Sequence, residues 1–326
     1  MPDLKMAPVG KRLKELLNQE VLVLDDCIGE EVKKAIDSSA SKIILLENLR
    51  FHPEEESCDE KFSKELASLA DVYVNDAFGT SHRKHASVWG VAKFTKVVAG
   101  LLLEKEIEYL GKILSNPKKP YMAILGGAKV SDKIEVIKNL MKNVDVFLVG
   151  GGMSYTFLKA LGQPIGKSKL EEDKIQIASQ ILQEAREKGI EIYLPEDHVV
   201  VKDINQPSGK KIVQQISEDE IAVDIGPATI EKFCSKLQEA NTILWNGPLG
   251  IFEIEEYAQG TKSIAEKVAQ LTQKGVVSVI GGGDTAASIS KFGLENKMSH
   301  VSTGGGASLE FMEGKILPGI EVLENK

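Results

Sequence analysis

One stretch decides the fold of this chain: Val276-Val277-Ser278-Val279-Ile280-Gly281-Gly282-Gly283-Asp284-Thr285-Ala286-Ala287. Its first five residues are apolar or small and mostly β-branched, a pattern that predicts a short buried strand. The three glycines predict a tight turn, and Asp284 begins a helical pattern. Such a turn leaves backbone N–H groups free at a helix N-terminus, where the helix dipole favours an anion. Because glycine has no Cβ, a phosphate can approach this backbone closely.

The position of Asp284 allows two interpretations. A carboxylate at the mouth of an anion site repels a phosphate unless a cation lies between them, which indicates Mg²⁺ bound to a nucleotide. Alternatively, Asp284 is an N-cap residue after a tight turn. One turn of this kind, taken alone, favours the N-cap.

Four further glycine-rich turns follow apolar strand patterns. Alternating strand and helix patterns from residue 121 onward predict a parallel sheet with helices on both faces. In such a sheet the turns that follow the strands lie at one edge, where ligands of open α/β sheets bind. Five turns at one edge therefore predict a phosphate-rich ligand; besides the turn at Gly281 they are Gly126–Lys129, Gly150–Met153, Asn246–Gly250 and Thr303–Gly306.

Two lysines, Lys129 and Lys133, follow the Gly126-Gly127 pair. The spacing predicts that both lie on one face at the start of a helix. The helix dipole disfavours cations there, and a phosphate bound between the lysines would reverse that cost. The alternative is two ordinary surface lysines. In the first half of the chain, Arg50 and Arg83 each follow a predicted strand, and each is a candidate for binding a carboxylate or phosphate or for a surface salt bridge.

Composition excludes several classes of protein. The 326 residues suffice for two domains, and a net charge of −8 argues against a broad nucleic-acid or anionic-membrane surface. Three separated cysteines (Cys27, Cys58, Cys234) without a CxxC pair indicate neither a disulfide framework nor a zinc site. No signal-peptide pattern or apolar run of membrane-spanning length occurs. We therefore expect a soluble, cytoplasmic protein.

Two nucleotide-binding motifs are absent. The stretch Gly162–Ser168 has three residues where a Walker A motif needs four, and no strand precedes it directly. Gly281, Gly283 and Ala286 fit GxGxxA, but residues 303–306 hold Thr and Gly where an oxidoreductase of the dinucleotide-binding class needs a ribose-binding acid. A helical pattern over residues 103–114 predicts a connector between two domains, and residues 198–223 predict a hairpin or excursion from the sheet.

Six strings of the chain together resemble phosphoglycerate kinase: Leu46–Phe51, Val74–Arg83, Gly126–Lys133, Trp245–Glu253, Gly281–Thr285 and Ser302–Ala307. The resemblance covers essentially the whole chain. It implies an α/β fold of two Rossmann-like parallel-sheet domains joined by a hinge helix: 1–98 for the glycerate, 99–115 as connector, 116–306 for the nucleotide, and a tail, 307–326, that returns to the first domain. It also implies reversible phosphoryl transfer between 1,3-bisphosphoglycerate and ADP, giving 3-phosphoglycerate and ATP, in a protein that is usually a monomer.

The resemblance also implies roles for single residues. Arg50 and Arg83 would bind the substrate, and Lys129, with Gly282 and Gly283, would act on the transferring phosphoryl group. Asp284 would hold Mg²⁺ through the nucleotide, which is ADP or ATP. Glu253 would bond the ribose hydroxyls. The remaining nucleotide-binding residues would be Gly127, Lys133, Gly151, Asn246, Pro248, Gly281 and Thr285.

One departure from the family pattern is large. The family begins with two further strands that carry substrate-binding residues and an arginine acting on the phosphoryl group, and none of these strings occurs here. We therefore expect an incomplete first domain that is unstable or adhesive, and a chain that binds nucleotide with weak or absent turnover. Three alternatives remain. The first is a phosphoglycerate kinase family enzyme truncated by fragmentary sequencing, a misplaced start or a real gene alteration, and the second is a catalytically dead nucleotide-binding module of the same fold. The third is an oxidoreductase whose Gly281 turn binds a dinucleotide.

Overall fold

The computed structural model describes residues 2–323, which form two compact units. The first extends to Glu104 and includes the segment from Ile316 onward, and the second is Lys105–Lys315. Helix α5 (Leu101–Ser115) carries the border between them. Of the predicted apolar positions, Leu103 and Leu110 are buried, whereas Ile107 and Leu114 are half-buried. None of the helices within the described residues is long and apolar enough to cross a membrane.

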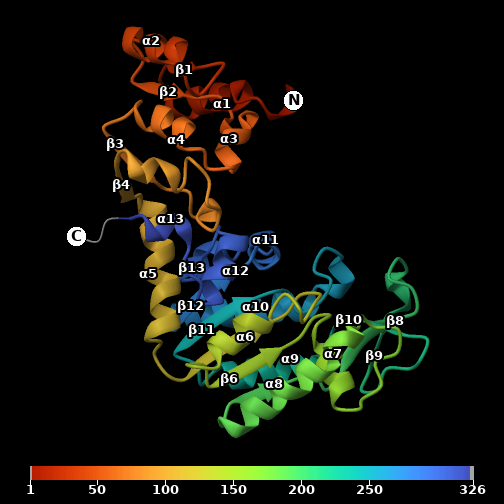
Figure 1. Ribbon diagram of the computed structural model, residues 1–326. Helices are drawn as coiled ribbons and strands as arrows, with labels where there is room; N and C mark the ends of the chain where they lie inside the picture. Colours follow the sequence, from red (N-terminus) through yellow and green to blue (C-terminus); the bar gives the residue numbers. More distant parts are fainter. Residues whose placement is uncertain (1, 324–326) are drawn as a thin grey trace. The chain divides into compact units, whose positions relative to one another are not determined.

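The second unit is built on a six-stranded sheet in the order β13-β12-β11-β5-β6-β7, and every pair is parallel (Figure 1). This confirms the predicted parallel sheet. The chain order reverses between β5 and β11, so this is the point where open α/β sheets bind ligands. The strands are β5 (Tyr121–Leu125), β6 (Val146–Val149), β7 (Glu191–Tyr193), β11 (Thr242–Asn246), β12 (Val277–Gly281) and β13 (His300–Val301).

One large core joins this sheet to three helices. Alternate residues of the central strands, such as Ile124 and Trp245, pack with Phe233, Ile264 and Ile289 of α9, α10 and α11. This burial fixes the carboxyl ends of the strands relative to one another. The helices of the unit after α5 are α6 (Ile134–Leu140), α7 (Ser154–Ala160), α8 (Ile175–Glu187), α9 (Pro227–Leu237), α10 (Gln259–Gln273), α11 (Gly283–Lys291) and α12 (Gly306–Met312).

A smaller antiparallel sheet interrupts the alternation, as predicted for residues 198–223. Its strands are β8 (His198–Val201), β9 (Lys211–Val213) and β10 (Ile221–Ile225), in the order β10-β8-β9. Strand β10 leads directly into α9, and the chain then returns to the main sheet at β11.

The first unit contains two separate two-stranded parallel sheets rather than one Rossmann-like sheet. Strand β1 pairs with β2, and β3 pairs with β4, a strand that the sequence analysis does not predict. The tail lies against the end of β3 and the segment after it: Asn75 Nδ2 donates to the Gly319 carbonyl at 3.3 Å, and the Gly319 N–H donates to the Ser81 carbonyl at 2.8 Å. The elements are α1 (Ala7–Leu17), β1 (Val21–Val23), α2 (Glu30–Ser38), β2 (Ile43–Leu45), α3 (Pro53–Glu56), α4 (Glu60–Ala67), β3 (Val72–Asn75), β4 (Lys96–Ala99) and α13 (Pro318–Glu321).

Candidate functional site

All five predicted glycine turns follow strands of the six-stranded sheet, at its carboxyl edge. Two of them interlock at the point where the strand order reverses. The Gly126 N–H donates to the Asn246 carbonyl at 3.0 Å, and the Gly127 N–H donates to the Pro248 carbonyl at 2.8 Å. A Cβ on Gly126 would come within 2.1 Å of the Pro248 carbonyl oxygen, so only glycine allows this backbone approach.

A cavity of about 320 Å³, called the lysine cavity below, opens beside these turns. It is lined by both predicted lysines, by the turn after β12 and by the N-terminus of α11. A site with two cations, free backbone amides and a helix N-terminus is suited to an anion. The lining residues are Gly127, Ala128, Lys129, Asp132, Lys133, Asn246, Gly247, Gly282, Gly283, Asp284, Thr285, Gly305, Gly306 and Leu309.

The two lysines reach this cavity in a different way from the predicted one. Helix α6 begins at Ile134, so Lys129 lies in the preceding loop and Lys133 is the N-cap residue. The prediction of one shared helix face is therefore wrong, because the chain after Gly127 makes a turn before it becomes helical. Burial lowers the pKa of Lys133, whose ammonium donates to Asn246 Oδ1. Asn246 Nδ2 in turn donates to the Gly281 carbonyl at 2.9 Å.

The turn after β12 has the predicted form. Gly282 has a φ of 89°, and α11 begins at Gly283. Thr285 accepts a hydrogen bond from the Gly247 N–H at 2.6 Å, which ties this turn to the one after β11. The Asp284 side chain is exposed and makes no hydrogen bond to any residue in the described part of the chain, so its oxygens fit a hard cation such as Mg²⁺. Gly281 is buried within β12 and lines neither this cavity nor the next.

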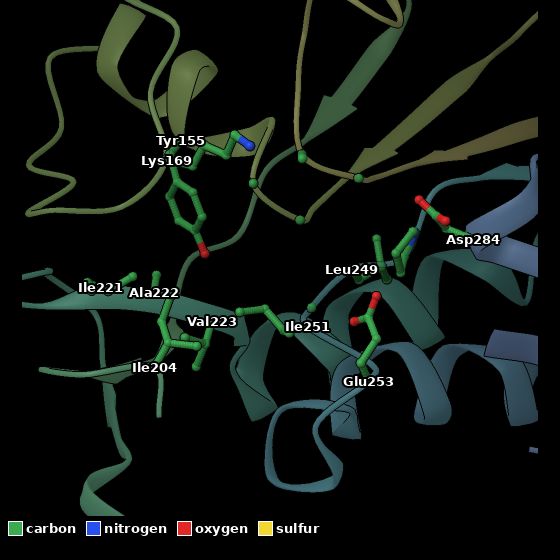
Figure 2. A pocket seen from close by; sticks show the side chains of 16 residues that line it. Tyr155, Lys169, Ile204, Ile221, Ala222, Val223, Leu249, Ile251, Glu253 and Asp284 are labelled. Atoms are coloured by element: carbon green, nitrogen blue, oxygen red, sulfur yellow. The ribbon is translucent and has the colours of Figure 1, made fainter. Parts of the chain in front are cut away.

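A second cavity of about 330 Å³, called the apolar cavity below, adjoins the first and shares Gly127, Ala128 and Asp284 with it. Tyr155 and Lys169 approach it from one side and strand β10 from the other, and the Glu253 carboxylate points into it (Figure 2). Its walls suit a flat, partly apolar group. The other lining residues are Gly151, Gly152, Ile204, Ile221, Ala222, Val223, Pro248, Leu249, Gly250 and Ile251.

The apolar cavity contains residues that the sequence analysis misses. Tyr155, Lys169 and Val223 line it but are not among the predicted site residues, although Tyr155 comes two residues after the Gly150–Met153 turn. Val223 lies on β10 of the antiparallel excursion, and only the folded chain places that excursion at the carboxyl edge of the main sheet. No spacing rule along the sequence connects these positions.

Arg50 and Arg83 both lie in the first unit and are exposed. Arg50 is in a 3₁₀ turn (Leu49–Phe51), and its Nε is 3.8 Å from a Glu56 oxygen. Burial lowers the pKa of His85; the Glu55 charge raises it, and the charges of both arginines lower it.

Asp26, Cys27 and His52 form the one group of possible metal ligands found in residues 2–323. Asp26 Oδ1 and His52 Nε2 are 2.7 Å apart, a hydrogen-bond distance. Two ligands of one tetrahedral zinc ion are roughly 3.3 Å apart, so a direct hydrogen bond explains this geometry.

Comparison with known proteins identifies the family of this chain. The family model described as "Phosphoglycerate kinase" matches residues 1–315. The chain belongs to the phosphoglycerate kinase family. It is 58% identical to phosphoglycerate kinase of Dictyoglomus turgidum over 99% of this chain and 82% of that protein. The phosphoglycerate kinase of Fervidobacterium nodosum is 52% identical over 100% of this chain and 82% of its own length.

Solved structures agree with this assignment. Phosphoglycerate kinase from Coxiella burnetii superposes with a TM-score of 0.87 at 41% identity, covering 98% of this chain and 80% of that one. The enzyme from Pyrococcus horikoshii OT3 gives a TM-score of 0.83 at 34% identity, covering 98% and 82%. The chain thus spans about four fifths of the length of these relatives.

The function follows from the family. The chain is a phosphotransferase with a carboxyl group as acceptor, and it transfers a phosphoryl group reversibly between 1,3-bisphosphoglycerate and ADP in glycolysis. The expected weak turnover and the alternative of a dead binding module are not supported, because the relatives that carry the enzyme's name match nearly the whole chain. The oxidoreductase alternative is wrong.

Proposed function

We propose that the nucleotide binds across the two adjoining cavities of the second unit. Its phosphates occupy the lysine cavity, and its base and ribose occupy the apolar cavity. The observation that carries this proposal is the shared border at Gly127, Ala128 and Asp284, where strand order reverses between β5 and β11. Glu253, whose carboxylate points into the apolar cavity, is the acceptor for the ribose hydroxyls.

Three charged groups of the lysine cavity, Lys129, Lys133 and Asp284, have proposed roles. Lys133 binds a nucleotide phosphate, and the amides of Gly282 and Gly283 donate to phosphate oxygens at the N-terminus of α11. Lys129, which is exposed and paired with no carboxylate among the described residues, stabilises the transferring phosphoryl group. Mg²⁺ held by the nucleotide and Asp284 supplies further positive charge. Phosphoryl transfer depends on such positioning and charge neutralisation rather than on covalent chemistry.

In the first unit, Arg50 and Arg83 are the proposed ligands of 3-phosphoglycerate. Both are exposed, and the one ion pair of the Arg50 side chain within residues 2–323 is the 3.8 Å contact with Glu56. A guanidinium binds a phosphate or carboxylate through two parallel hydrogen bonds, which fits a small anionic substrate.

Three further expectations remain proposals. The first is the division into a glycerate-binding domain (1–98), a connector (99–115), a nucleotide-binding domain (116–306) and a returning tail (307–326). The second is that the protein acts as a cytoplasmic monomer. The third is that its partners are small molecules rather than nucleic acid or membrane. Mass determination of the purified protein in solution tests the monomer directly.

Steady-state kinetics of three lysine variants test the nucleotide site. Lys129→Met should lower kcat by about 10³, because its contact forms mainly in the transition state. Lys133→Met should raise the KM for ADP about tenfold with a smaller effect on kcat. Lys167→Met is the control, since Lys167 is exposed and lines neither cavity. Equal effects from all three variants would overturn the proposal.

A further inference from the structure

A buried carboxyl group lies directly behind the wall of the apolar cavity. Asp224 is only 1% exposed and follows Val223, a residue of that wall, on β10. Its Oδ2 accepts a hydrogen bond from the Gly260 N–H at 2.6 Å, and its Oδ1 accepts one from the Ile225 N–H at 2.9 Å. Gly260 is in the first turn of α10, so Asp224 caps this helix from another element.

The carboxyl group fills a gap between two backbone segments. A Cβ on Gly250, in the loop after β11, would come within 2.3 Å of Asp224 Oδ1, and so would a Cβ on Gly260. Gly250 itself lines the apolar cavity, next to Leu249 and Ile251. The position of this loop therefore depends on the group packed beneath it.

We propose that Asp224 is a positioning residue for nucleotide binding, because its carboxyl group holds the Gly250 loop and the start of α10 in the arrangement that shapes the apolar cavity. This inference rests on the proposed binding of the nucleotide in that cavity. Asp224 does not touch the cavity's interior, since the lining includes Val223 and Gly250 but not Asp224. It acts through these neighbours.

The environment of Asp224 is suited to a fixed structural role. Burial raises its pKa to about 7, whereas the two amide hydrogen bonds and the charge of Lys210 lower it. Burial raises the pKa of the Tyr155 hydroxyl, and the negative charge of Asp224 raises it further. The group is thus held by hydrogen bonds that compensate its removal from water.

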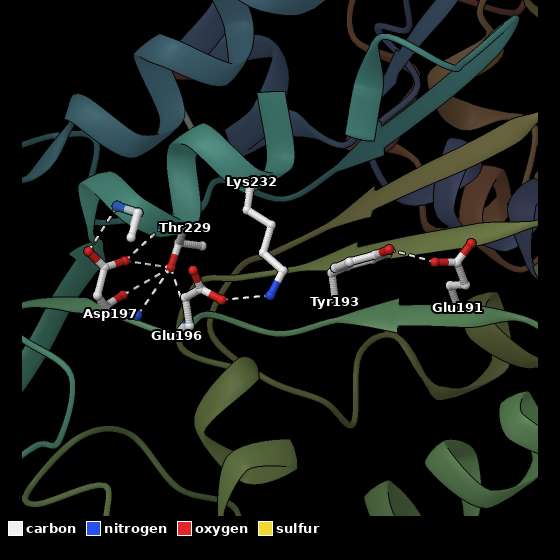
Figure 3. Close-up of polar contacts among 7 residues, drawn as sticks. Glu191, Tyr193, Glu196, Asp197, Thr229 and Lys232 are labelled. Carbon is white, nitrogen blue, oxygen red and sulfur yellow. Dashed lines mark hydrogen bonds and ion pairs between the residues drawn. The ribbon is translucent and has the colours of Figure 1, made fainter. Parts of the chain in front are cut away.

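A second aspartate offers a matched control in the same unit. Asp197 is 4% exposed and caps α9: its oxygens accept from the Ala228 N–H at 2.9 Å and the Thr229 N–H at 2.8 Å (Figure 3). A Cβ on Gly226 would come within 2.3 Å of its carboxyl group. Asp197 therefore shares the burial, the helix cap and the adjacent glycine of Asp224, but it lines neither the lysine cavity nor the apolar cavity and has no neighbour in their walls.

The test compares Asp224→Asn with Asp197→Asn in the full chain. Asparagine keeps the shape but replaces one acceptor oxygen by a donor, so each variant loses one hydrogen bond from a backbone N–H. We expect Asp224→Asn to raise the KM for ADP about tenfold with kcat changed less than about twofold. Asp197→Asn should lower the melting temperature to a similar extent and leave the KM unchanged. Equal KM values for the two variants would overturn the proposal.

A second variant and a positive control keep the test decisive. Gly260→Ala disturbs the same contact from the helix side, since its Cβ would meet Asp224, and it should also raise the KM for ADP. Lys133→Met reports on the nucleotide site itself. A KM that responds to Lys133→Met but not to Asp224→Asn or Gly260→Ala refutes the role of Asp224 alone. A KM that responds to none of them refutes the proposed nucleotide site.

Discussion

The two units of the chain use parallel strands with very different burial. In the second unit, every residue of β5, β6 and β11 is buried between layers of helices. In the first unit, β1 and β2 are only half-buried, and Val72 and Val74 of β3 are 49% and 53% exposed. Each strand of the first unit has one partner, whereas the central strands of the second have two.

This difference in burial and pairing explains why the glycine turns of the second unit have fixed positions relative to one another. A strand that is buried on both faces and paired on both sides cannot shift its register without breaking two sets of ladder hydrogen bonds and repacking both faces. The turns after β5, β11 and β12 are therefore fixed relative to one another, as the Gly126–Asn246 and Gly247–Thr285 hydrogen bonds show. The strands of the first unit, which have one partner each and include exposed valines, restrain the loops that follow them much less.

The largest expected effect tests this contrast in burial. Leu244→Ala, at a fully buried position of β11, should lower the free energy of unfolding by about 3 kcal/mol through the lost packing and the cavity left behind. Val74→Ala, at an exposed position of β3, should lower it by less than about 0.5 kcal/mol. Urea denaturation measures both values. Equal losses of unfolding free energy in the two variants would contradict the difference in burial between the two units.

A buried histidine of the second unit gives a smaller effect that depends on pH. Burial lowers the pKa of His198 to about 4, and its Nδ1 has no hydrogen-bond partner in the described structure. Because the unfolded chain binds this proton more readily, stability should fall as the pH drops from 7. The loss should reach about 2 kcal/mol at pH 5.

The variant His198→Asn checks the origin of that loss. Its absolute stability will differ from that of the parent, but the slope of stability against pH between 7 and 5 should become shallower. Thermal or urea denaturation at several pH values gives the slope. An unchanged slope would show that other groups govern the acid sensitivity.

The sequence alone predicts the sheet and the turns of the second unit well, because burial on both faces leaves continuous apolar runs such as Tyr121–Leu125. It fails where order comes from tertiary contact. Strand β4 has only Val97 and Val98 as an apolar run, and the position of Lys129 in a loop depends on how the Gly126 turn packs on Pro248. For the same reason the β10 side of the apolar cavity is invisible in the sequence.

Two glycines at opposite ends of β12 separate backbone strain from an effect on the nucleotide site. Gly275 precedes the strand with a φ of 97°, and Gly282 follows it with a φ of 89°, so alanine strains the backbone at both. Only Gly282 lines the lysine cavity, and its Cβ would come within 2.8 Å of Asn246 Nδ2. Gly282→Ala should raise the KM for ADP about tenfold, and Gly275→Ala should leave it unchanged. Steady-state kinetics would contradict this account if both variants bound ADP alike.

The smallest expected effect concerns Lys169, at the wall of the apolar cavity. It makes no ion pair with any described carboxylate, so its charge remains available to a bound nucleotide. Lys169→Met should raise the KM for ADP about threefold, a value typical of an exposed charge contact. Lys167→Met, two residues earlier, is the control, and equal KM values for the two variants would remove Lys169 from the site.

Hydrogen–deuterium exchange with and without Mg-ADP is the sharpest test of the nucleotide site, because it reports which backbone amides the bound nucleotide protects. We expect slower exchange of backbone amides in residues 126–133, 151–155, 246–251 and 281–286 when Mg-ADP is bound. We expect little change in β1 and β3. Protection absent from the turns after β5, β11 and β12 would contradict the proposed nucleotide site.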